Sequence, residues 1–589
     1  MTVVLHRIVG LALRQRFLVV GAIGASLLSA VAGLTLPKLY GRAVDQTLHL
    51  LTHAHQSGAQ AREALVITAL LVAITAFARG LLTGLGVFLA EACSHKVAYE
   101  LRLQFLSQLH RLSFSFHDKI HSGELITRGM LDLDAIRDFI QGGMMRSLTL
   151  LLLILVSATL MGATDPRMAA LALSFVPIAI FAQTGAGMSM CSSWLKVQRA
   201  MSALTLTIQE SLQGSRVVRA FAGKTFEMAK FDRAADQVLR ECLGHIKLRL
   251  RASKIVTMSF YSSMTLLLWY GGQPVIAHRI TVGRLTEFLT YMTMLQMPIL
   301  QIAQIVSQAA RTTSSGARLF EILDLEPEIY DPPGALHLAA KPVAVRFEGV
   351  GFAYEPGKPV LQDISFEVRP GETLGIVGAP GSGKSTIANL IPRFFEATAG
   401  RITINDQDVR SVTLESLRTY VGLVQQETFL FDETVRSNVA YADPEADDER
   451  VYDAARAAQI HSYVEGLPLR YESRVGERGV ALSGGQRQRL SIARGLTPRP
   501  NLMVFDDSTA AVDAVTERKL RDALAAVGES RTVIIISHRL STLIHADEIL
   551  VLDAGRIVER GNHATLLRLG GVYAELCALQ SRLATHAPI

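Results

Sequence analysis

Long apolar stretches alternate with charged segments in the first half of the chain. Six predominantly apolar stretches precede residue 310, at 17–39, 63–91, 139–162, 167–188, 255–277 and 285–306. A helix needs about 20 such residues to cross the hydrocarbon core of a bilayer. The pattern therefore predicts six transmembrane helices.

The first apolar stretch has features of a signal peptide as well as of a membrane helix. Arg7, Arg14 and Arg16 precede it, and the tripeptide AVA at 30–32 resembles a cleavage site. However, the apolar run is longer than most signal cores, and it continues through 37–44 without a break. We expect a retained membrane helix.

The links between the predicted helices alternate in length. The links near 163–166 and 278–284 are short, whereas 92–138 and 189–254 are long and rich in Lys and Arg. Because cytoplasmic loops carry an excess of these residues, we expect the long links, the N-terminus and everything after the sixth helix to be cytoplasmic. The long links contain no proline and mostly follow a helical pattern, so we expect them to extend the membrane helices.

Three charged residues, Arg79, Arg146 and Glu287, lie within or beside the predicted spans. A charge inside a membrane is a candidate functional residue, because burying it is costly. It can equally face a water-filled cavity or form a structural pair. The sequence does not decide between these readings.

The pattern changes beyond about residue 320. The runs TLGIVG, TVIIIS and EILVLD are typical of buried strands, whereas ESLRTY and VYDAARAAQI follow a helical pattern. This alternation predicts an α/β domain with a largely parallel sheet. Pro327, Pro332, Pro333 and Gly334 mark a linker in front of it.

Composition agrees with a membrane half joined to a soluble half. The chain has 589 residues, of which 19% are charged, and a mean hydropathy of +0.28. The net charge of +6 is explained by basic cytoplasmic loops, and no basic run interleaved with aromatics points to nucleic acid. The four cysteines, at 93, 191, 242 and 577, have no metal-binding spacing and are expected to be reduced.

A glycine-rich loop follows the run TLGIVG. Residues 378–385 fit the pattern G-x-x-x-x-G-K-[ST] without a mismatch, between a predicted strand and a predicted helix. Gly381 and Gly383 allow a tight turn whose backbone N–H groups point at phosphate oxygens. Lys384 is expected to reach the β- and γ-phosphates of a nucleotide, and the Ser385 hydroxyl to bind Mg²⁺.

The expected fold is therefore a membrane α-helical domain of six transmembrane helices with long cytoplasmic extensions, plus an α/β P-loop ATPase domain. The expected boundaries are 1–320 for the transmembrane domain, 321–342 for the linker, 343–580 for the nucleotide-binding domain and 581–589 for a C-terminal tail.

Two further motifs support nucleotide binding. The run NLMVF ends in Asp506, and a buried strand can deliver such a carboxylate rigidly to the magnesium shell. In the run LSGGQ, Ser483, Gly484 and Gly485 open a predicted helix, a second place where backbone N–H groups can hold phosphate. This second cradle lacks a lysine, so it makes physical sense as a cover for nucleotide held by another subunit.

Together these motifs resemble ABC transporters over essentially the whole chain, in the arrangement of an exporter-type half-transporter. The resemblance implies that ATP and Mg²⁺ are bound by this chain. The expected ATP contacts are Tyr354, which would stack on adenine, and Gly378, Ala379, Pro380, Gly381, Ser382, Gly383, Lys384, Ser385 and Thr386.

The resemblance also assigns roles outside the glycine loop. Gln426 matches the glutamine that contacts Mg²⁺ and water, alongside Ser385 and Asp506, and His538 matches the switch histidine near the γ-phosphate. Asp513 matches the residue that communicates across the dimer. Ser483, Gly484, Gly485 and Gln486 match the signature that completes the partner's ATP site.

The long basic links resemble the family's two intracellular loops, whose short transverse helices press on nucleotide-binding domains. We expect these helices near 113–119 and 212–219. By analogy, the second should contact the domain of the opposite subunit.

Asp507 departs from the family pattern, which has glutamate after the magnesium aspartate to polarise the attacking water. A general base must lie about 2.6–3.2 Å from the proton that it takes. Removing one methylene withdraws the carboxylate by roughly 1.5 Å, and a misplacement of about 1 Å can cost on the order of 10²-fold in rate. We expect this site to bind ATP well and to hydrolyse it slowly.

The resemblance suggests why such a site exists. Exporters built from two different half-transporters often contain one impaired site, with aspartate in place of glutamate. We therefore favour a heterodimer over a homodimer in which Asp507 still catalyses hydrolysis. The expected function is ATP-driven efflux of a small or amphiphilic substrate, such as a drug, lipid or peptide, across the cytoplasmic membrane. An importer, for example of a metal–siderophore complex, and an ATP-gated channel are the alternatives.

Overall fold

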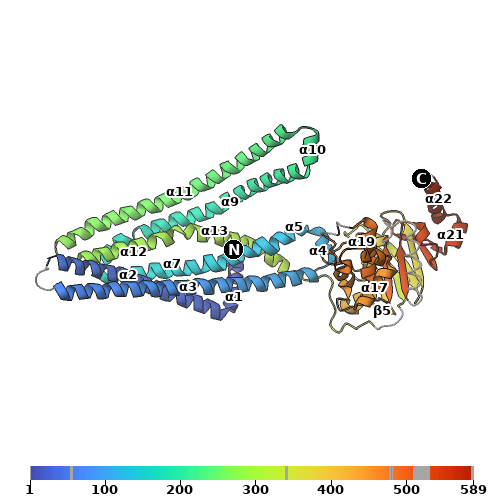
Figure 1. Cartoon of the computed structure of the whole chain (residues 1–589), viewed down its shortest axis with the longest axis horizontal. Coiled ribbons are helices and arrows are strands. Elements are labelled where there is room, and N and C mark those ends of the chain that lie inside the picture. Colours follow the sequence, from blue (N-terminus) through green and yellow to red (C-terminus); the bar gives the residue numbers. More distant parts are fainter. Residues whose placement is uncertain are drawn as a thin grey trace. The chain divides into compact units, whose positions relative to one another are not determined.

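The computed structural model describes residues 2–52, 58–338, 343–476, 479, 482–507 and 531–585. The chain divides into two compact units (Figure 1). The first combines Met1–Arg111 with His121–Leu325, and the second combines Leu112–Ile120 with Glu326–Ile589. The short segment Leu112–Ile120 thus belongs to the second unit, although the residues before and after it in the sequence belong to the first.

Helices joined by short turns make up the described residues of the first unit. Its α-helices are α1 (Thr2–Arg14), α2 (Arg16–Thr52), α3 (Gly58–Arg111), α5 (Ser122–Thr127), α6 (Leu133–Asp138), α7 (Met145–Thr164), α8 (Pro166–Leu173), α9 (Phe175–Gln213), α10 (Ser215–Ala220), α11 (Lys224–Ile276), α12 (Val282–Leu300) and α13 (Ile302–Leu323). Two π-helical turns, η1 (Arg128–Asp132) and η2 (Phe139–Met144), join α5, α6 and α7.

Five helical segments of the described chain are long and apolar enough to cross a membrane. They are Arg16–Leu51, Arg62–Arg111, Ser122–Thr164, Pro166–Gln213 and Val282–Leu323. Each contains one of the predicted spans. The remaining predicted span, 255–277, forms the C-terminal part of α11, where serine, threonine and tyrosine interrupt the apolar run.

The helices extend well beyond the lengths of the apolar stretches, as the proline-free links predict. The helix α3 continues to Arg111, and α9 and α11 form a long hairpin whose tip is α10 (Figure 1). The second transverse helix was expected to begin near residue 212. It begins at Ser215 instead, because α9 runs on through Gln213 and Gly214 separates the two helices.

Close backbone approach joins α2 to α12. A Cβ atom at Gly283 would lie 2.0 Å from the Gly41 carbonyl oxygen, so a larger residue cannot fit there without a shift. The Gly283 N–H donates to the Asp45 carboxylate at 2.7 Å, and the Tyr291 hydroxyl donates to the Leu34 carbonyl at 3.0 Å. Buried polar groups are thereby satisfied at this crossing.

The described residues of the second unit form two sheets. The antiparallel sheet has the order β2-β1-β4-β5 and consists of β1 (Val345–Phe352), β2 (Leu361–Val368), β4 (Ala399–Ile404) and β5 (Gln407–Asp408). The second sheet has the order β10-β9-β3-β8-β7-β6, is parallel except for β10, and consists of β3 (Thr373–Gly378), β6 (Val421–Val424), β7 (Leu502–Asp506), β8 (Thr532–Ile536), β9 (Glu548–Asp553) and β10 (Arg556–Gly561). The predicted strands TLGIVG, TVIIIS and EILVLD are therefore confirmed as β3, β8 and β9.

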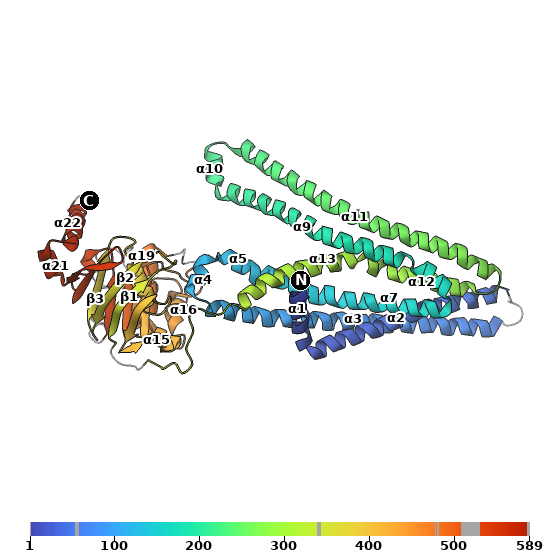
Figure 2. The ribbon, with the colours of Figure 1, turned by 180° about the vertical axis from the view of Figure 1, so that it is seen from behind.

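Helices cover the sheets of the second unit. They are α4 (Phe114–Lys119), α14 (Lys384–Leu390), α15 (Leu414–Tyr420), α16 (Val435–Val439), α17 (Asp448–Ala457), α18 (His461–Glu465), α19 (Gly484–Leu496), α21 (His563–Leu569) and α22 (Val572–Thr585), with 3₁₀ turns η3 (Ala440–Ala442), η4 (Arg470–Glu472) and η6 (Leu540–Thr542). Figure 2 shows α21 and α22 at the C-terminal end of the chain.

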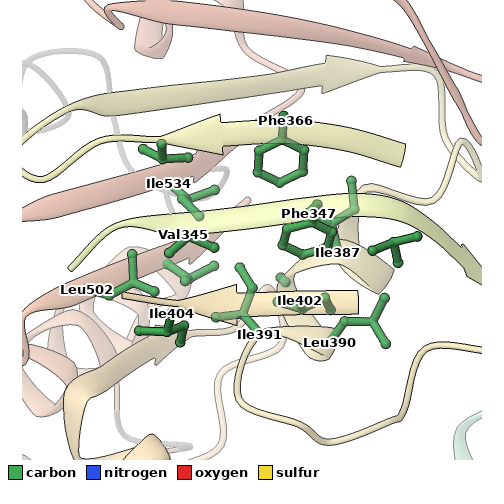
Figure 3. Packing of buried hydrophobic residues seen from close by; sticks show 14 of the residues in the cluster. Val345, Phe347, Phe366, Ile387, Leu390, Ile391, Ile402, Ile404, Leu502 and Ile534 are labelled. Atoms are coloured by element: carbon green, nitrogen blue, oxygen red, sulfur yellow. The ribbon is translucent and has the colours of Figure 1, made fainter. Parts of the chain in front are cut away.

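One buried cluster joins the two sheets. Phe347 of β1 stacks on Phe366 of β2, with ring centroids 4.4 Å apart, and Ile387 of α14 lies in the same cluster (Figure 3). Leu502 and Ile534 contribute from the parallel strands. Because these strands are buried on both faces, their sequences are continuous apolar runs rather than alternating ones.

Candidate nucleotide-binding site

The glycine loop leaves the carboxyl end of β3 and leads into α14. Gly381 and Gly383 have φ values of +81° and +99°, a region that side chains other than glycine rarely adopt. A Cβ atom at Gly383 would also lie 2.6 Å from Leu361, and one at Gly378 would lie 2.2 Å from the Leu552 carbonyl oxygen. The loop therefore needs glycine for both its turn and its packing.

Lys384 is buried at the start of α14 and folds back over this loop. Its Nζ donates to the carbonyl oxygens of Gly378 at 2.9 Å and Ala379 at 2.8 Å, and to the Ser382 hydroxyl at 3.4 Å. Burial lowers the pKa of the Lys384 ammonium, while the nearby carboxylates of Asp506 and Asp507 act in the opposite direction. The Lys384 ammonium is thus held against the loop by weak neutral acceptors, which phosphate oxygens can replace.

Ser385 and Asp506 meet at the carboxyl end of the parallel sheet. The Ser385 hydroxyl donates to Asp506 Oδ1 at 3.0 Å, and Gln426 lines the same pocket. Burial raises the pKa of the Asp506 carboxyl; the Ser385 hydrogen bond lowers it, and the neighbouring Asp507 raises it further. Hydroxyl, carboxylate and carboxamide oxygens are the ligands that Mg²⁺ prefers, so these residues fit a magnesium ion.

Asp507 follows β7 in an unusual backbone conformation. Its φ is +44°, in the left-handed region, where aspartate occurs several times more often than most residues. Its N–H donates to the Ile536 carbonyl at 2.8 Å, and its Oδ1 accepts a long hydrogen bond of 3.4 Å from the His538 backbone N–H. The carboxylate is 7% exposed and is held toward the loop that carries His538.

Tyr354 presents part of its ring to solvent at the opposite wall of the pocket. It is 47% exposed and packs edge-on against Phe352 and Phe395, with ring centroids 4.8 and 5.2 Å away. Its hydroxyl lies 3.2 Å from the Thr386 hydroxyl. These contacts fix the plane of an aromatic ring on which a base can stack.

The structure brings most of the sequence-predicted site residues into one pocket. The residues that line it include Tyr354, Pro380, Gly381, Gly383, Lys384, Ser385, Thr386, Gln426, Asp506, Asp507 and His538. Gly378, Ala379 and Ser382 belong to the same glycine loop and accept hydrogen bonds from Lys384. Asp513 lies outside the described residues.

The signature residues are absent from the described lining of this pocket and form the start of α19 instead. The Gln486 N–H donates to the Ser483 hydroxyl at 3.3 Å, and the Ser483 N–H donates to the Gln486 side chain at 2.7 Å. This reciprocal pair is a capping box, which fixes the first turn of the helix. Gly484 and Gly485 lie within that turn and leave its backbone uncovered by side chains.

Sequence reasoning missed several contacts around the site. Thr386 was expected as an ATP contact, but its contact with Tyr354 was not foreseen. Gln580 of α22 bonds the loop at His538, although 42 positions separate the two residues. No local pattern points to this contact, whereas the spacing S-x-x-Q does indicate the capping box of α19.

A separate cavity of about 380 Å³ lies inside the first unit. Its lining is mixed, and it includes Ser26, Ser29, Gly33, Arg79, Thr83, Gln141, Met145, Arg146, Leu150, Leu153, Met294 and Gln301. Both intramembrane arginines singled out in the sequence line it, whereas Glu287 does not. Neither arginine forms an ion pair within the described ranges, and no Asp or Glu is among the described lining residues.

Comparison with known proteins agrees with this architecture. Residues 19–299 match the family model of the ABC transporter transmembrane region, and residues 361–510 match the ABC transporter model. The solved structure of a bacterial Atm1-family ABC exporter with ATP bound is similar with a TM-score of 0.82 and 30% sequence identity. That similarity covers 96% of this chain and 98% of the solved one.

Curated relatives are similar over most of their length. An ATP-dependent lipid A-core flippase of Syntrophus aciditrophicus is 35% identical over 82% of this chain and 80% of its own. A putative multidrug export ATP-binding/permease protein of Bacillus subtilis is 33% identical over 84% of this chain and 85% of its own.

The fold and the site thus define a multi-pass membrane protein with an ATP-binding domain. The chain belongs to the ABC transporter family. It is an ATP-hydrolysing half-transporter with the exporter fold, and carries one transmembrane and one nucleotide-binding unit in a single polypeptide.

Proposed function

We propose that this chain is one half of a heterodimeric exporter in the cytoplasmic membrane, with its N-terminus and nucleotide-binding unit in the cytoplasm. It uses ATP to move an amphiphilic substrate outward. Its own ATP site holds nucleotide and hydrolyses it slowly. The observation that carries this proposal is the short carboxylate of Asp507, bound to the His538 N–H at the edge of an otherwise well-formed site.

The residues present support tight binding of ATP with Mg²⁺. Lys384 exchanges its bonds to the loop carbonyls for phosphate oxygens, which are stronger acceptors because they are charged. Ser385, Asp506 and Gln426 would hold the ion, which would supply charge neutralisation at the phosphates. None of these contacts depends on the length of the side chain at position 507.

Slow hydrolysis follows from the reach of Asp507. Its carboxylate lies against the His538 backbone, and extending it toward the pocket requires giving up that bond. A base displaced by about 1 Å loses on the order of 10²-fold in rate. The Asp507 carboxylate is therefore poorly placed to take a proton from the attacking water, while the nucleotide stays bound.

The partner is proposed to supply the efficient site. In the sandwich arrangement of the family, the signature of one chain covers the nucleotide of the other. The helix start at Ser483 is well formed by its capping box, so this chain can complete a competent site on its partner. A second, different half-transporter with a glutamate base then drives the cycle.

Nucleotide retention tests this proposal. The complex with its partner is loaded with radiolabelled ATP and Mg²⁺, freed of excess nucleotide and quenched at intervals. We expect one ATP per complex to persist while the other is converted to ADP, and Lys384→Ala in this chain to abolish the persistent ATP. Conversion of both nucleotides at the same rate would contradict the proposal.

The cavity of the membrane unit supports an amphiphilic substrate with an anionic group. Leucine and methionine side chains offer apolar contact, and Arg79 and Arg146 offer positive charge without a carboxylate partner among the described lining residues. Unpaired cations in a low-dielectric site attract an anion strongly. The relatives named as a lipid A-core flippase and a putative multidrug exporter are consistent with an amphiphile.

Two amphiphiles of equal chain length, an alkyl phosphate and an alkyl trimethylammonium, test this substrate class in inside-out vesicles. We expect ATP-dependent uptake of the phosphate, reduced about tenfold by Arg79→Gln or Arg146→Gln. Arg167→Gln is the matched control, because Arg167 lies outside this cavity. Preferential uptake of the cation would contradict the anionic class, and ATP-dependent release in the opposite direction would indicate import.

A further inference from the structure

The C-terminal helix α22 is firmly attached to the nucleotide-binding unit. Tyr573 is fully buried, its hydroxyl lies 2.7 Å from His563 Nδ1, and Leu576 and Cys577 pack on the same cluster. The Glu559 carboxylate accepts the first N–H groups of the helix, from Val572 at 2.5 Å and from Tyr573 at 3.1 Å. Helical spacing then places Gln580, one turn beyond Leu576 and Cys577, on the same face.

Gln580 bridges the loop that follows β8. Its Nε2 donates to the His538 carbonyl at 2.5 Å, and its Oε1 accepts from the Leu540 N–H at 3.1 Å. Both polar ends of the carboxamide are therefore used on one short segment of backbone. Such a two-point contact restrains position and orientation together, which a single hydrogen bond does not.

The same segment is held from the other side by Asp507. The His538 N–H donates to the Asp507 carboxylate, while the His538 carbonyl accepts from Gln580. The backbone of His538 thus lies between the carboxylate of the ATP pocket and the C-terminal helix. Movement of α22 would therefore shift the His538 backbone, and with it the His538 side chain, which lines that pocket.

We propose that Gln580 is a positioning residue for ATP hydrolysis, which sets the place of His538 through its backbone. The inference rests on the proposed role of His538 at the phosphates. In this proposal α22 restrains the loop after β8 that carries His538, so that displacement of this helix slows hydrolysis without releasing ATP. Gln580 is not among the described residues that line the ATP pocket, so it acts through the loop.

The test uses the full-length complex with Asp507→Glu in this chain, so that this site can turn over. In that parent, we expect Gln580→Ala to lower kcat about tenfold, because the loop loses two restraining bonds, one at the His538 carbonyl and one at the Leu540 N–H. The KM for ATP and the thermal unfolding midpoint should remain close to those of the parent. Glu575→Ala, on the exposed side of α22, is the matched control and should change none of these quantities.

Gln580→Leu separates hydrogen bonding from packing. Leucine fills a similar volume but has no polar atoms, so we expect the same loss of kcat as with alanine. A kcat close to that of the parent for both variants would overturn the proposal. A fall in the thermal unfolding midpoint of Gln580→Ala together with the fall in kcat would also overturn it, because this result would indicate a purely structural role.

Amide hydrogen exchange reads the contact independently of turnover. Gln580→Ala should speed exchange of the Leu540 amide, which loses its acceptor, and Glu575→Ala should not. Unchanged exchange at Leu540 would overturn the proposed contact. If this chain's own site in the parent hydrolyses no ATP while exchange at Leu540 still responds, the result would contradict the proposed function and support the contact.

Discussion

Asp507 differs from glutamate in more than length. Its left-handed backbone favours aspartate, and its carboxylate is directed to the backbone of His538. Both features keep the acid group close to the strand end from which it starts. On the proposed function, the site therefore combines residues that fit phosphate and Mg²⁺ with a base that is poorly placed.

Asp507→Glu should raise ATP hydrolysis at this chain's own site on the order of 10²-fold, because the added methylene restores the reach of the base. Affinity for ATP should stay within about twofold, since it rests on Lys384, Ser385 and Asp506. Single-turnover quench kinetics on the assembled complex measure the effect. Asp507→Asn, which keeps the size and removes the base, is the control and should remain slow.

Asp506 is expected to reduce the stability of the nucleotide-free protein. Burial raises the pKa of its carboxyl above the unfolded value, so folding favours the protonated form. Its destabilising effect therefore grows as pH rises from the unfolded pKa to the raised folded pKa, is complete above the folded pKa, and fades as pH falls back through this window. Asp506→Asn should raise the thermal unfolding midpoint near pH 7 in the presence of EDTA.

Two comparisons check this prediction. The gain from Asp506→Asn should shrink as the pH is lowered, because wild-type Asp506 then becomes neutral as well. The same variant should lose the extra stabilisation that ATP with Mg²⁺ gives the wild-type protein. An unfolding midpoint that falls at pH 7 would show that burial of the charge is not the dominant effect.

At the scale of elements, α4 is packed on the nucleotide-binding unit although its neighbours in sequence belong to the membrane unit. Phe114 lies with its ring centroid 4.4 Å from that of Phe394 and 6.4 Å from that of Phe395. Phe395 in turn packs against Tyr354, which lines the ATP pocket. A continuous row of aromatic rings thus joins the transverse helix to the nucleotide site.

Phe114→Ala should uncouple transport from hydrolysis. It removes an aromatic contact worth about 0.5–1.5 kcal/mol beyond its burial, on a short helix with no buried residues of its own. We expect transport in vesicles to fall about tenfold, with ATP affinity unchanged. Lys119→Ala, exposed on the same helix, is the control; equal losses in both variants would contradict a specific role of the ring.

Sequence patterns predicted the elements better than their ends. The strands of the parallel sheet are continuous apolar runs, and the glycine loop marks one strand end unambiguously. The second transverse helix was placed three residues early, since the helical pattern of 212 and 213 belongs to α9. Helix ends depend on such local competition, which periodicity does not register.

The site was predictable wherever a motif has fixed spacing. Lys384 and Ser385 begin the helix that follows β3, and Asp506 ends β7. The three residues lie together because β3 and β7 are parallel strands of one sheet, separated only by β8, so their carboxyl ends lie at the same edge. The contact of Gln580 with His538 and the φ of Asp507 were not predictable. Both result from packing between distant segments, and neither leaves a pattern in the local sequence.

At the scale of the whole molecule, the two units divide the work of transport. The membrane unit offers a cavity with two unpaired arginines among its described lining residues, and the other unit offers a nucleotide site. On the proposed function, the signature of a second chain completes that site. A half-transporter is therefore incomplete alone. The identity of its partner decides between two arrangements. In a heterodimer, the site at Asp507 is paired with a different site, whereas in a homodimer both sites carry Asp507.

The native mass and subunit composition of the tagged chain, expressed with its neighbouring genes and purified in mild detergent, test the central claim most directly. The account predicts a 1:1 complex with a second, different half-transporter whose base is glutamate. A homodimer that hydrolyses ATP at both sites at the rates of efficient transporters would contradict it, because Asp507 would then be a competent base.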